Sequence, residues 1–120
     1  MAFLPHLESV VSQVEGALAC SVMGIDGIAV ETHESSAAAE FELSSAWAEY
    51  SAPFRQIKDA AETLKTGSMS EICINSERVT TLMRMVSPEY FLVLALRSDG
   101  NFGKARFLLR VTAPKVKAEL

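Results

Sequence analysis

The most constraining feature of this sequence is a strict apolar repeat between residues 43 and 64. Its members are separated alternately by four and three residues over about three heptads: Leu43, Trp47, Tyr50, Phe54, Ile57, Ala61 and Leu64. A period of about 3.5 residues is typical of a helix that packs lengthwise against another helix. Alanines beside this stripe widen it enough to contact a sheet as well. We therefore predict one long helix, interrupted at Pro53, where one backbone hydrogen bond is lost, and ended at Gly67.

The segments before this helix predict another helix and a β-hairpin. Apolar residues recur at three- and four-residue spacing from Phe3 to Leu18, which indicates one face of a helix that stops near Gly16. Two short apolar runs, 18–23 and 28–32, then flank Gly24-Ile25-Asp26-Gly27, whose glycines can supply the positive φ of a tight turn. A loop of glutamate, serine and alanine residues leads from the hairpin into the long helix.

Three strands and a final helix are predicted after the long helix. Residues 71–75 and 79–86 form a second hairpin, and the continuously apolar run 90–96 belongs in the middle of a sheet. The predicted order is α-β-β-α-β-β-β-α, an α+β fold in which helices flank a five-stranded antiparallel sheet. The last helix has six residues on its predicted apolar face: Phe102, Ala105, Leu109, Thr112, Ala113 and Val116.

Length, charge and hydropathy narrow the class of protein. A chain of 120 residues suits one core, so we expect a single domain over residues 1–120. A formal net charge of -4 argues against a nucleic-acid partner, which needs clustered cations. No apolar run approaches the ~18 residues that span a bilayer, and the N-terminal segment lacks a secretion signal, so we expect a cytosolic protein. We interpret the basic residues near the end as the solvated face of the last helix: Lys104, Arg106, Arg110, Lys115 and Lys117.

The sequence contains no recognisable catalytic or metal-binding constellation. Cys20 and Cys73 lie far apart without CxxC spacing, and His6 and His33 have no metal-ligand spacing to either cysteine. The segment 100–105 differs from a phosphate loop, because its glycines are too close and no Ser or Thr follows the lysine. We therefore expect a protein that is not an enzyme and has no catalytic residues, metal or cofactor.

Three local patterns, in this order along the chain, carry a resemblance to a known family. They are the hairpin run from Met23 to Ile28, the apolar strand 90–96, and the segment 103–106 that opens the last helix. With the element order, the whole chain resembles the roadblock/LC7 family, a profilin-like α/β/α sandwich. It is most similar to short bacterial members linked to gliding motility and cell polarity.

The resemblance implies a homodimer. Roadblock domains usually pair their long central helices and join their third strands into one continuous sheet. This implies an interface of Trp47, Tyr50, Phe54 and Ile57 on the helix and Ile72, Cys73 and Ile74 on the strand. An exposed apolar edge strand would otherwise invite aggregation, which also favours pairing. The alternative is that Trp47 and Phe54 belong to the core of their own chain.

Function follows from the resemblance as an expectation. It implies a non-catalytic adaptor that binds a roadblock paralogue, and so modulates a Ras-like small GTPase directly or indirectly, at a cell pole to which partners recruit it. The alternative is a small-molecule-sensing profilin-like module, whose candidate polar residues in the core are Thr80, Thr81 and Arg84. Five carboxylates off the apolar stripe are interpreted as a solvated face rather than a partner surface: Glu40, Glu42, Glu49, Asp59 and Glu62.

Overall fold

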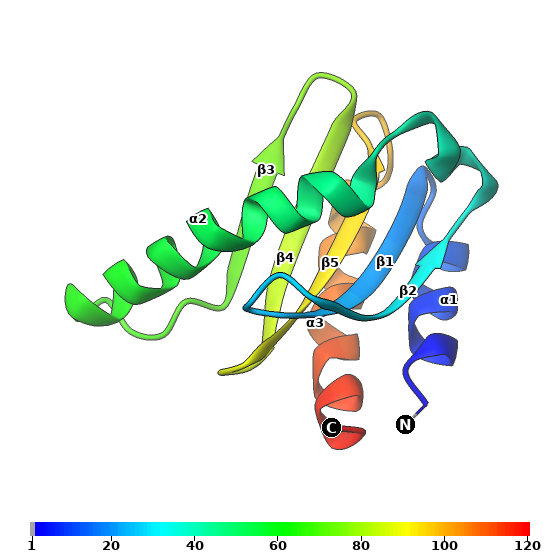
Figure 1. Ribbon diagram of the computed structural model, residues 1–120. Coiled ribbons are helices and arrows are strands. Elements are labelled where there is room, and N and C mark those ends of the chain that lie inside the picture. Colours follow the sequence, from blue (N-terminus) through cyan, green and yellow to red (C-terminus); the bar gives the residue numbers. More distant parts are fainter. Residues whose placement is uncertain (1) are drawn as a thin grey trace.

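The predicted order of elements is confirmed by the computed structural model, which describes residues 2–120 (Figure 1). The helices are α1 (Leu4–Gln13), α2 (Leu43–Thr63) and α3 (Phe102–Ala118). The strands are β1 (Ala17–Gly24), β2 (Ala29–Glu34), β3 (Glu71–Asn75), β4 (Val79–Ser87) and β5 (Tyr90–Arg97). A short 3-10 helix, η1 (Ser36–Glu40), occupies the segment expected to be a loop. α2 runs through Pro53 and ends at Thr63, before the predicted stop at Gly67.

The five strands form one antiparallel sheet in the order β2-β1-β5-β4-β3. β5 lies in the middle, and its side chains from Phe91 to Leu96 are buried, as the continuous apolar run predicted. A strand with helices over both of its faces needs no alternation of polar residues. β2 and β3 are the edges, so each has one side without a strand partner among residues 2–120.

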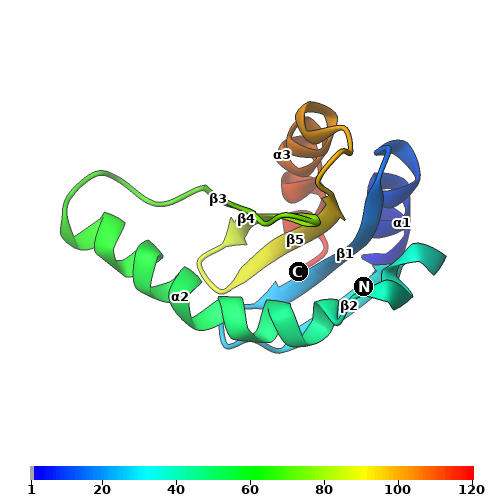
Figure 2. The same ribbon diagram turned by 90° about the horizontal axis from the view of Figure 1, so that it is seen from above.

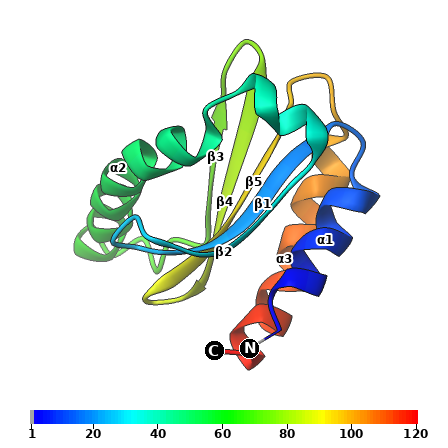
Figure 3. The same ribbon diagram turned by 45° about the vertical axis from the view of Figure 1, so that its right-hand side comes forward.

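Helices cover both faces of the sheet and divide the core into two clusters (Figure 2). α1 and α3 lie side by side on one face (Figure 3), and α2 and η1 cover the other. The cluster on the α1 and α3 side includes Leu7, Val10, Cys20, Leu82, Leu94, Leu109 and Val116. The cluster on the α2 side includes Leu18, Leu43, Trp47, Phe54, Met83, Phe91 and Val93.

α2 crosses the sheet and continues past the β3 edge (Figure 1). Phe54 is buried against the sheet, with its ring centroid 4.6 Å from that of Phe91. Farther along the same stripe, the Ile57 side chain is 50% exposed and that of Leu64 is 72% exposed. A helix of 21 residues is about 31 Å long, whereas the four spacings between five strands cover only about 19 Å. The heptad stripe is therefore divided between the chain's own sheet and solvent.

One residue that was predicted on the apolar face of α3 is exposed in the structure. The other five predicted residues are buried, but the Phe102 ring is 39% exposed. Phe102 begins the helix, directly after Asn101, whose side-chain Oδ1 accepts a hydrogen bond from the Lys104 N–H at 3.1 Å. The ring lines a groove with Arg106 and Phe107 instead of joining the core, so the prediction for Phe102 is wrong.

The turn after α1 approaches the turn between β5 and α3 so closely that it requires a glycine. Gly16 has a φ of +87°, and a Cβ at this position would lie 2.8 Å from the Cα of Gly100. Two backbone hydrogen bonds join the segments: the Arg97 N–H donates to the Gly16 carbonyl at 2.8 Å, and the Asn101 N–H donates to the Glu15 carbonyl at 2.9 Å. Neither turn can move away without losing these bonds.

Gly16→Ala is therefore expected to lower the free energy of unfolding by about 2–4 kcal/mol, because left-handed strain adds to backbone overlap. Urea denaturation followed by circular dichroism measures this change. Gly67→Ala is the matched control, because Gly67 has a φ of +99° but a Cβ added there would meet nothing within 4 Å. The control is expected to lower the free energy of unfolding by only about 1 kcal/mol. Equal losses in the two variants would contradict the role of the close approach.

Candidate interaction surfaces

The seven residues predicted for a dimer interface lie on α2 and β3 but differ widely in exposure. Trp47 and Phe54 are buried in the cluster between α2 and the sheet of the same chain. This is the alternative that the sequence left open, and in this arrangement neither ring offers surface to a second chain. Tyr50 is half-buried beside the same cluster. On α2, only the part of the stripe beyond Phe54 is free.

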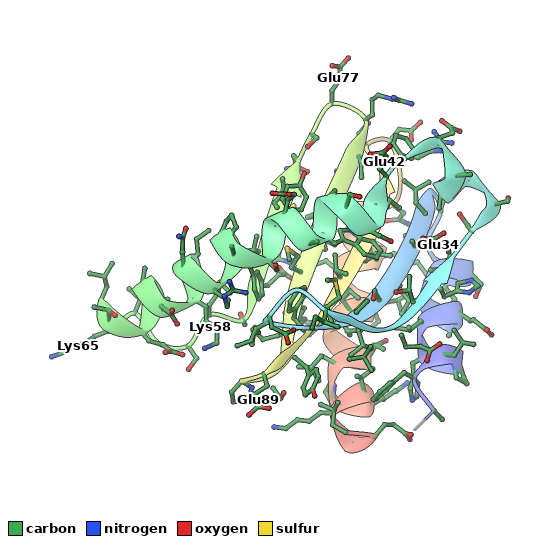
Figure 4. All side chains as sticks on the ribbon, in the orientation of Figure 1. Glu34, Glu42, Lys58, Lys65, Glu77 and Glu89 are labelled. Carbon is green, nitrogen blue, oxygen red and sulfur yellow. The ribbon has the colours of Figure 1, made fainter. Side chains whose placement is uncertain are left out.

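Two large apolar side chains are exposed at this end of α2: Ile57 on the helix and Leu64, the residue that directly follows it. Figure 4 labels Lys58 and Lys65, which mark this projecting end of the helix. Lys58 pairs with Glu62 across one helical turn, with 3.3 Å between Nζ and Oε1. A contact of this kind on an exposed helix contributes little to stability. We call this segment, residues 57–64, the α2 overhang.

The β3 edge lies beside the α2 overhang (Figure 1). Ile72 and Ile74 are half-buried on the α2 side of the strand, whereas Cys73 is exposed. Partial desolvation and the Glu71 carboxylate raise the pKa of the Cys73 thiol, and Arg106 opposes them. Burial raises the pKa of Cys20 to about 12. At neutral pH both groups are protonated thiols, the less nucleophilic form.

The acidic side chains off the stripe are exposed, in agreement with a solvated face. Glu40 pairs with two arginines, at 2.8 Å from Arg97 and 3.5 Å from Arg78. Arg55 differs from a simple surface charge, because its guanidinium donates to the carbonyl of Ile25. It thereby connects α2 to the β1–β2 turn.

The three polar residues considered for a small-molecule site do not converge. Thr81 lines a cavity of about 360 Å³ between the start of α2 and the β3–β4 turn. Thr80 points to the other face of the sheet and contacts Asn75 Oδ1 at 3.1 Å. Arg84 pairs with Glu71 and lines a different groove. Because alternate residues of a strand face opposite sides, no single cavity receives all three.

Metal, membrane and phosphate features are lacking in the part of the chain that the structure describes. Within residues 2–120, no three His, Cys, Asp or Glu side chains are placed to hold a metal ion. In the same range, no helix combines the length and the apolar character needed to cross a membrane. The turn with an incomplete phosphate-loop pattern is filled by the chain itself, since a Cβ on Gly100 would lie 2.7 Å from the Glu15 carbonyl oxygen.

Sequence reasoning missed one exposed apolar surface, at the β1–β2 turn. Ile28 is 67% exposed, Val30 is also exposed, and both line a groove of about 350 Å³ together with Ile25 and Tyr90. The Ile25 N–H donates to the Glu89 carbonyl at 3.0 Å, which holds this turn against the β4–β5 turn. The available signal was the spacing of Ile28 and Val30, two residues apart in the run 28–32 that the sequence predicted to be a strand. We call this surface the hairpin patch: Ile25, Ile28, Val30 and Tyr90.

Comparisons with known proteins give several similar structures. No protein-family model and no curated protein matches the chain. MglC from Myxococcus xanthus is 65% identical, with 100% of each chain covered and a TM-score of 0.73. The gliding protein MglB from Thermus thermophilus is 16% identical over 96% of this chain and 85% of that chain, with a TM-score of 0.83. A roadblock/LC7 domain from Streptomyces avermitilis is 10% identical over 95% of this chain and 93% of that chain, with a TM-score of 0.80.

The matches at low identity show a shared fold only. They extend to profilin IA from Acanthamoeba castellanii, which is 10% identical over 98% of each chain with a TM-score of 0.59. The profilin-like α/β/α arrangement expected from the sequence is therefore confirmed.

Proposed function

This chain belongs to the roadblock/LC7 family, and from that membership we propose that it is a non-catalytic, homodimeric adaptor. It binds a roadblock paralogue of the MglB type, and through this paralogue it modulates a Ras-like small GTPase in cell polarity and gliding motility. It acts in the cytoplasm, and its partners recruit it to a cell pole. The similarity to MglC and the fold shared with the gliding protein MglB support this proposal.

The observation that carries the proposal is the position of the α2 overhang beside the β3 edge (Figure 1). The overhang exposes Ile57 and Leu64, and β3 has no strand partner on its outer side among residues 2–120. A second copy related by a twofold axis would cover the apolar side chains and pair the two strands. Both features lie at one edge of the sheet, so one contact satisfies both.

The twofold contact leaves the hairpin patch free for a different partner. The patch lies at the β1–β2 turn, next to the opposite edge of the sheet from β3. Apolar surface at the rim of a sheet favours binding of another protein. We assign the MglB-type paralogue to this patch and the second copy of the chain to the α2 overhang.

Binding and GTPase assays test the adaptor function. With a purified MglB-type paralogue, Ile28→Asp is expected to weaken binding at least about tenfold, because it places a charge in a desolvated contact. Val111→Asp is the matched control on the exposed side of α3. With a Ras-like GTPase, the adaptor is expected to change the rate of hydrolysis only when the paralogue is present. Faster hydrolysis with this protein and the GTPase alone would contradict a non-catalytic adaptor.

Cys73 provides a test of the strand pairing. It is the central residue of β3, so a twofold antiparallel pairing of Glu71–Asn75 centred on it places the two Cys73 residues opposite each other. Opposed Cα atoms in antiparallel strands are about 4.5–5.5 Å apart, which is within disulfide range. Mild oxidation with copper phenanthroline is expected to give a species at twice the 13.0 kDa chain mass on non-reducing gels.

Cys73→Ser is expected to abolish this cross-link, while Cys20→Ser leaves it intact because Cys20 is buried. A dimer in solution that does not cross-link under oxidation would contradict a pairing centred on Cys73. The reaction is expected to accelerate toward alkaline pH, since the raised pKa of Cys73 leaves little thiolate at neutral pH.

A further inference from the structure

The exposed side of α3 concentrates positive charge in an otherwise acidic chain. The net charge is -4, yet α3 carries five of the eleven Lys and Arg residues and no Asp or Glu between Phe102 and Ala118. All five cations are exposed: Lys104, Arg106, Arg110, Lys115 and Lys117. The sequence pattern alone indicates a uniform solvated face, but these cations are not equivalent in the structure.

Two of these cations line a groove between α3 and β4. Its volume is about 490 Å³, and its lining comprises Arg84, Phe102, Gly103, Arg106, Phe107 and Arg110. The four residues from Gly103 to Arg110 recur at spacings of three, one and three, which places them on one side of the helix. α3 lies on the opposite face of the sheet from α2 (Figure 2). The groove is therefore separate from the α2 overhang.

Two arginines that line the groove already bind one carboxylate of their own chain. Glu71 Oε2 lies 2.5 Å from Arg106 Nε, and Glu71 Oε1 lies 3.4 Å from an Arg84 guanidinium nitrogen. This bridge shows that guanidinium groups from α3 and β4 can share a carboxylate. One carboxylate against Arg84, Arg106 and Arg110 leaves an excess of positive charge in the groove.

Arg110 is the cation of the groove without an acidic partner among residues 2–120. Its guanidinium lies 5.8 Å from the centroid of the Phe107 ring, which is 53% exposed. Arg106 keeps further N–H donors, because its contact with Glu71 uses Nε only. Arginine and aromatic residues are enriched at protein interfaces relative to the rest of a protein surface.

We propose that this groove binds an acidic segment of a partner protein. Carboxylates of the segment pair with Arg110 and with the free donors of Arg106, and an apolar side chain lies between Phe102 and Phe107. The stretch from Gly103 to Arg110 rises about 10 Å along the helix, the length of three residues of extended chain. An acidic–apolar–acidic pattern fits this length. The exposed Phe102 and Phe107 rings favour such a segment, because its apolar side chain can pack between them. An inorganic phosphate or a lipid headgroup has no apolar group to place there.

This binding goes beyond the adaptor function proposed above. It uses a different face from the α2 overhang and different residues from the hairpin patch. Glu71, which pairs with Arg84 and Arg106, is the one residue of this cluster that also belongs to the strand assigned to the homodimer. The dimer mass, measured on the same variants, separates failure of this proposal from failure of the homodimer.

The test uses a fluorescein-labelled peptide, Glu-Asp-Leu-Glu-Asp, and its uncharged counterpart, Gln-Asn-Leu-Gln-Asn. Fluorescence anisotropy measures the affinity of the full chain for each peptide at low salt and at about 0.3 M salt, where exposed charges are largely screened. Backbone amide shifts in NMR spectra map the site. We expect binding of the acidic peptide only, with shifts confined to residues 102–110 and to β3 and β4.

Arg106→Glu with Arg110→Glu is expected to weaken peptide binding at least about tenfold. Lys115→Glu with Lys117→Glu is the matched control: it makes the same change in net charge on the last turns of α3, outside the groove, and is expected to change affinity less than about twofold. Arg110→Glu alone keeps the Glu71 ion pairs, so it serves if the first double variant does not fold. Equal weakening by both double variants would overturn the proposal in favour of diffuse charge. Absence of peptide binding, with retention on phosphatidylglycerol vesicles, would overturn it in favour of a membrane surface.

Discussion

Ile57→Asp together with Leu64→Asp is expected to convert a homodimer of twice the 13.0 kDa chain mass into a monomer. Both side chains are exposed in the single chain and neither belongs to the buried core, so the substitution acts mainly on contacts to a second copy. A twofold contact contains each substitution twice, which gives four lost burials. Only the surface exposed in the single chain, 50% for Ile57 and 72% for Leu64, can be buried by a second copy. At about 1.5–3 kcal/mol for each fully buried aliphatic side chain, the loss is about 4–7 kcal/mol, or roughly three to five orders of magnitude in affinity.

Light scattering coupled to size exclusion, over a concentration series, measures this change. Thermal unfolding of the double variant shows whether the monomer stays folded, as we expect from the exposure of both residues. Val111→Asp, at an exposed apolar position on α3, is the control and is expected to leave the mass at the dimer value. If the unmodified chain is a monomer at every concentration, the homodimer is contradicted. The α2 overhang would then bind a different protein, and the adaptor would be a heterodimer.

Phe54→Ala is expected to lower the free energy of unfolding by about 3–5 kcal/mol, the usual cost of truncating a buried phenylalanine. The Phe54 ring is buried between α2 and the sheet, in contact distance of the Phe91 ring, so truncation leaves a cavity inside the single chain. Because the total stability of a small domain is about 5–15 kcal/mol, this one substitution removes a large part of it.

The measurement is best made by urea denaturation in the Ile57→Asp, Leu64→Asp background, where dimerisation does not add to the unfolding free energy. The control is Ile57→Ala, made in a chain that carries Leu64→Asp. Ile57 is on the next part of the stripe, and its truncation is expected to lower the free energy of unfolding by less than about 1 kcal/mol. The opposite pattern would be an unchanged unfolding free energy for Phe54→Ala in this background, together with loss of the dimer when Phe54→Ala is made alone. This result would indicate that Phe54 lies in the interface between two chains and would contradict its packing against its own sheet.

Periodicity was sufficient to predict the helices, the strands and their order along the chain, whereas the α/β/α layering came from the family resemblance. The run from Tyr90 to Leu96 has no charged residue, which only a strand covered on both faces tolerates, and β5 is the central strand. The glycines at positions 24 and 27 marked the β1–β2 turn. Each of these features is local, because the chemistry of a few neighbouring residues determines it.

The division of the α2 stripe could not be predicted in the same way. A repeat of apolar residues indicates that one side of a helix is covered, but it does not say which chain covers it. Trp47 and Phe54 face their own sheet, while Ile57 and Leu64 project past it. The reason is a difference in length between a 21-residue helix and a sheet of five strands, which appears only when the two are assembled.

The sequence by itself therefore determined the three α-helices and five strands of this protein, their order and, except at Phe102, the apolar side of the last helix. Only the tertiary structure decided which exposed side chains lie together. Arg84 lies on β4 and Arg106 and Arg110 on α3, more than twenty residues later in the chain, yet they line one groove. Arg84 and Arg106 also share the Glu71 carboxylate. The hairpin patch likewise joins Ile28 to Tyr90. Such contacts depend on strand register and helix placement, which the whole core fixes and no short segment encodes.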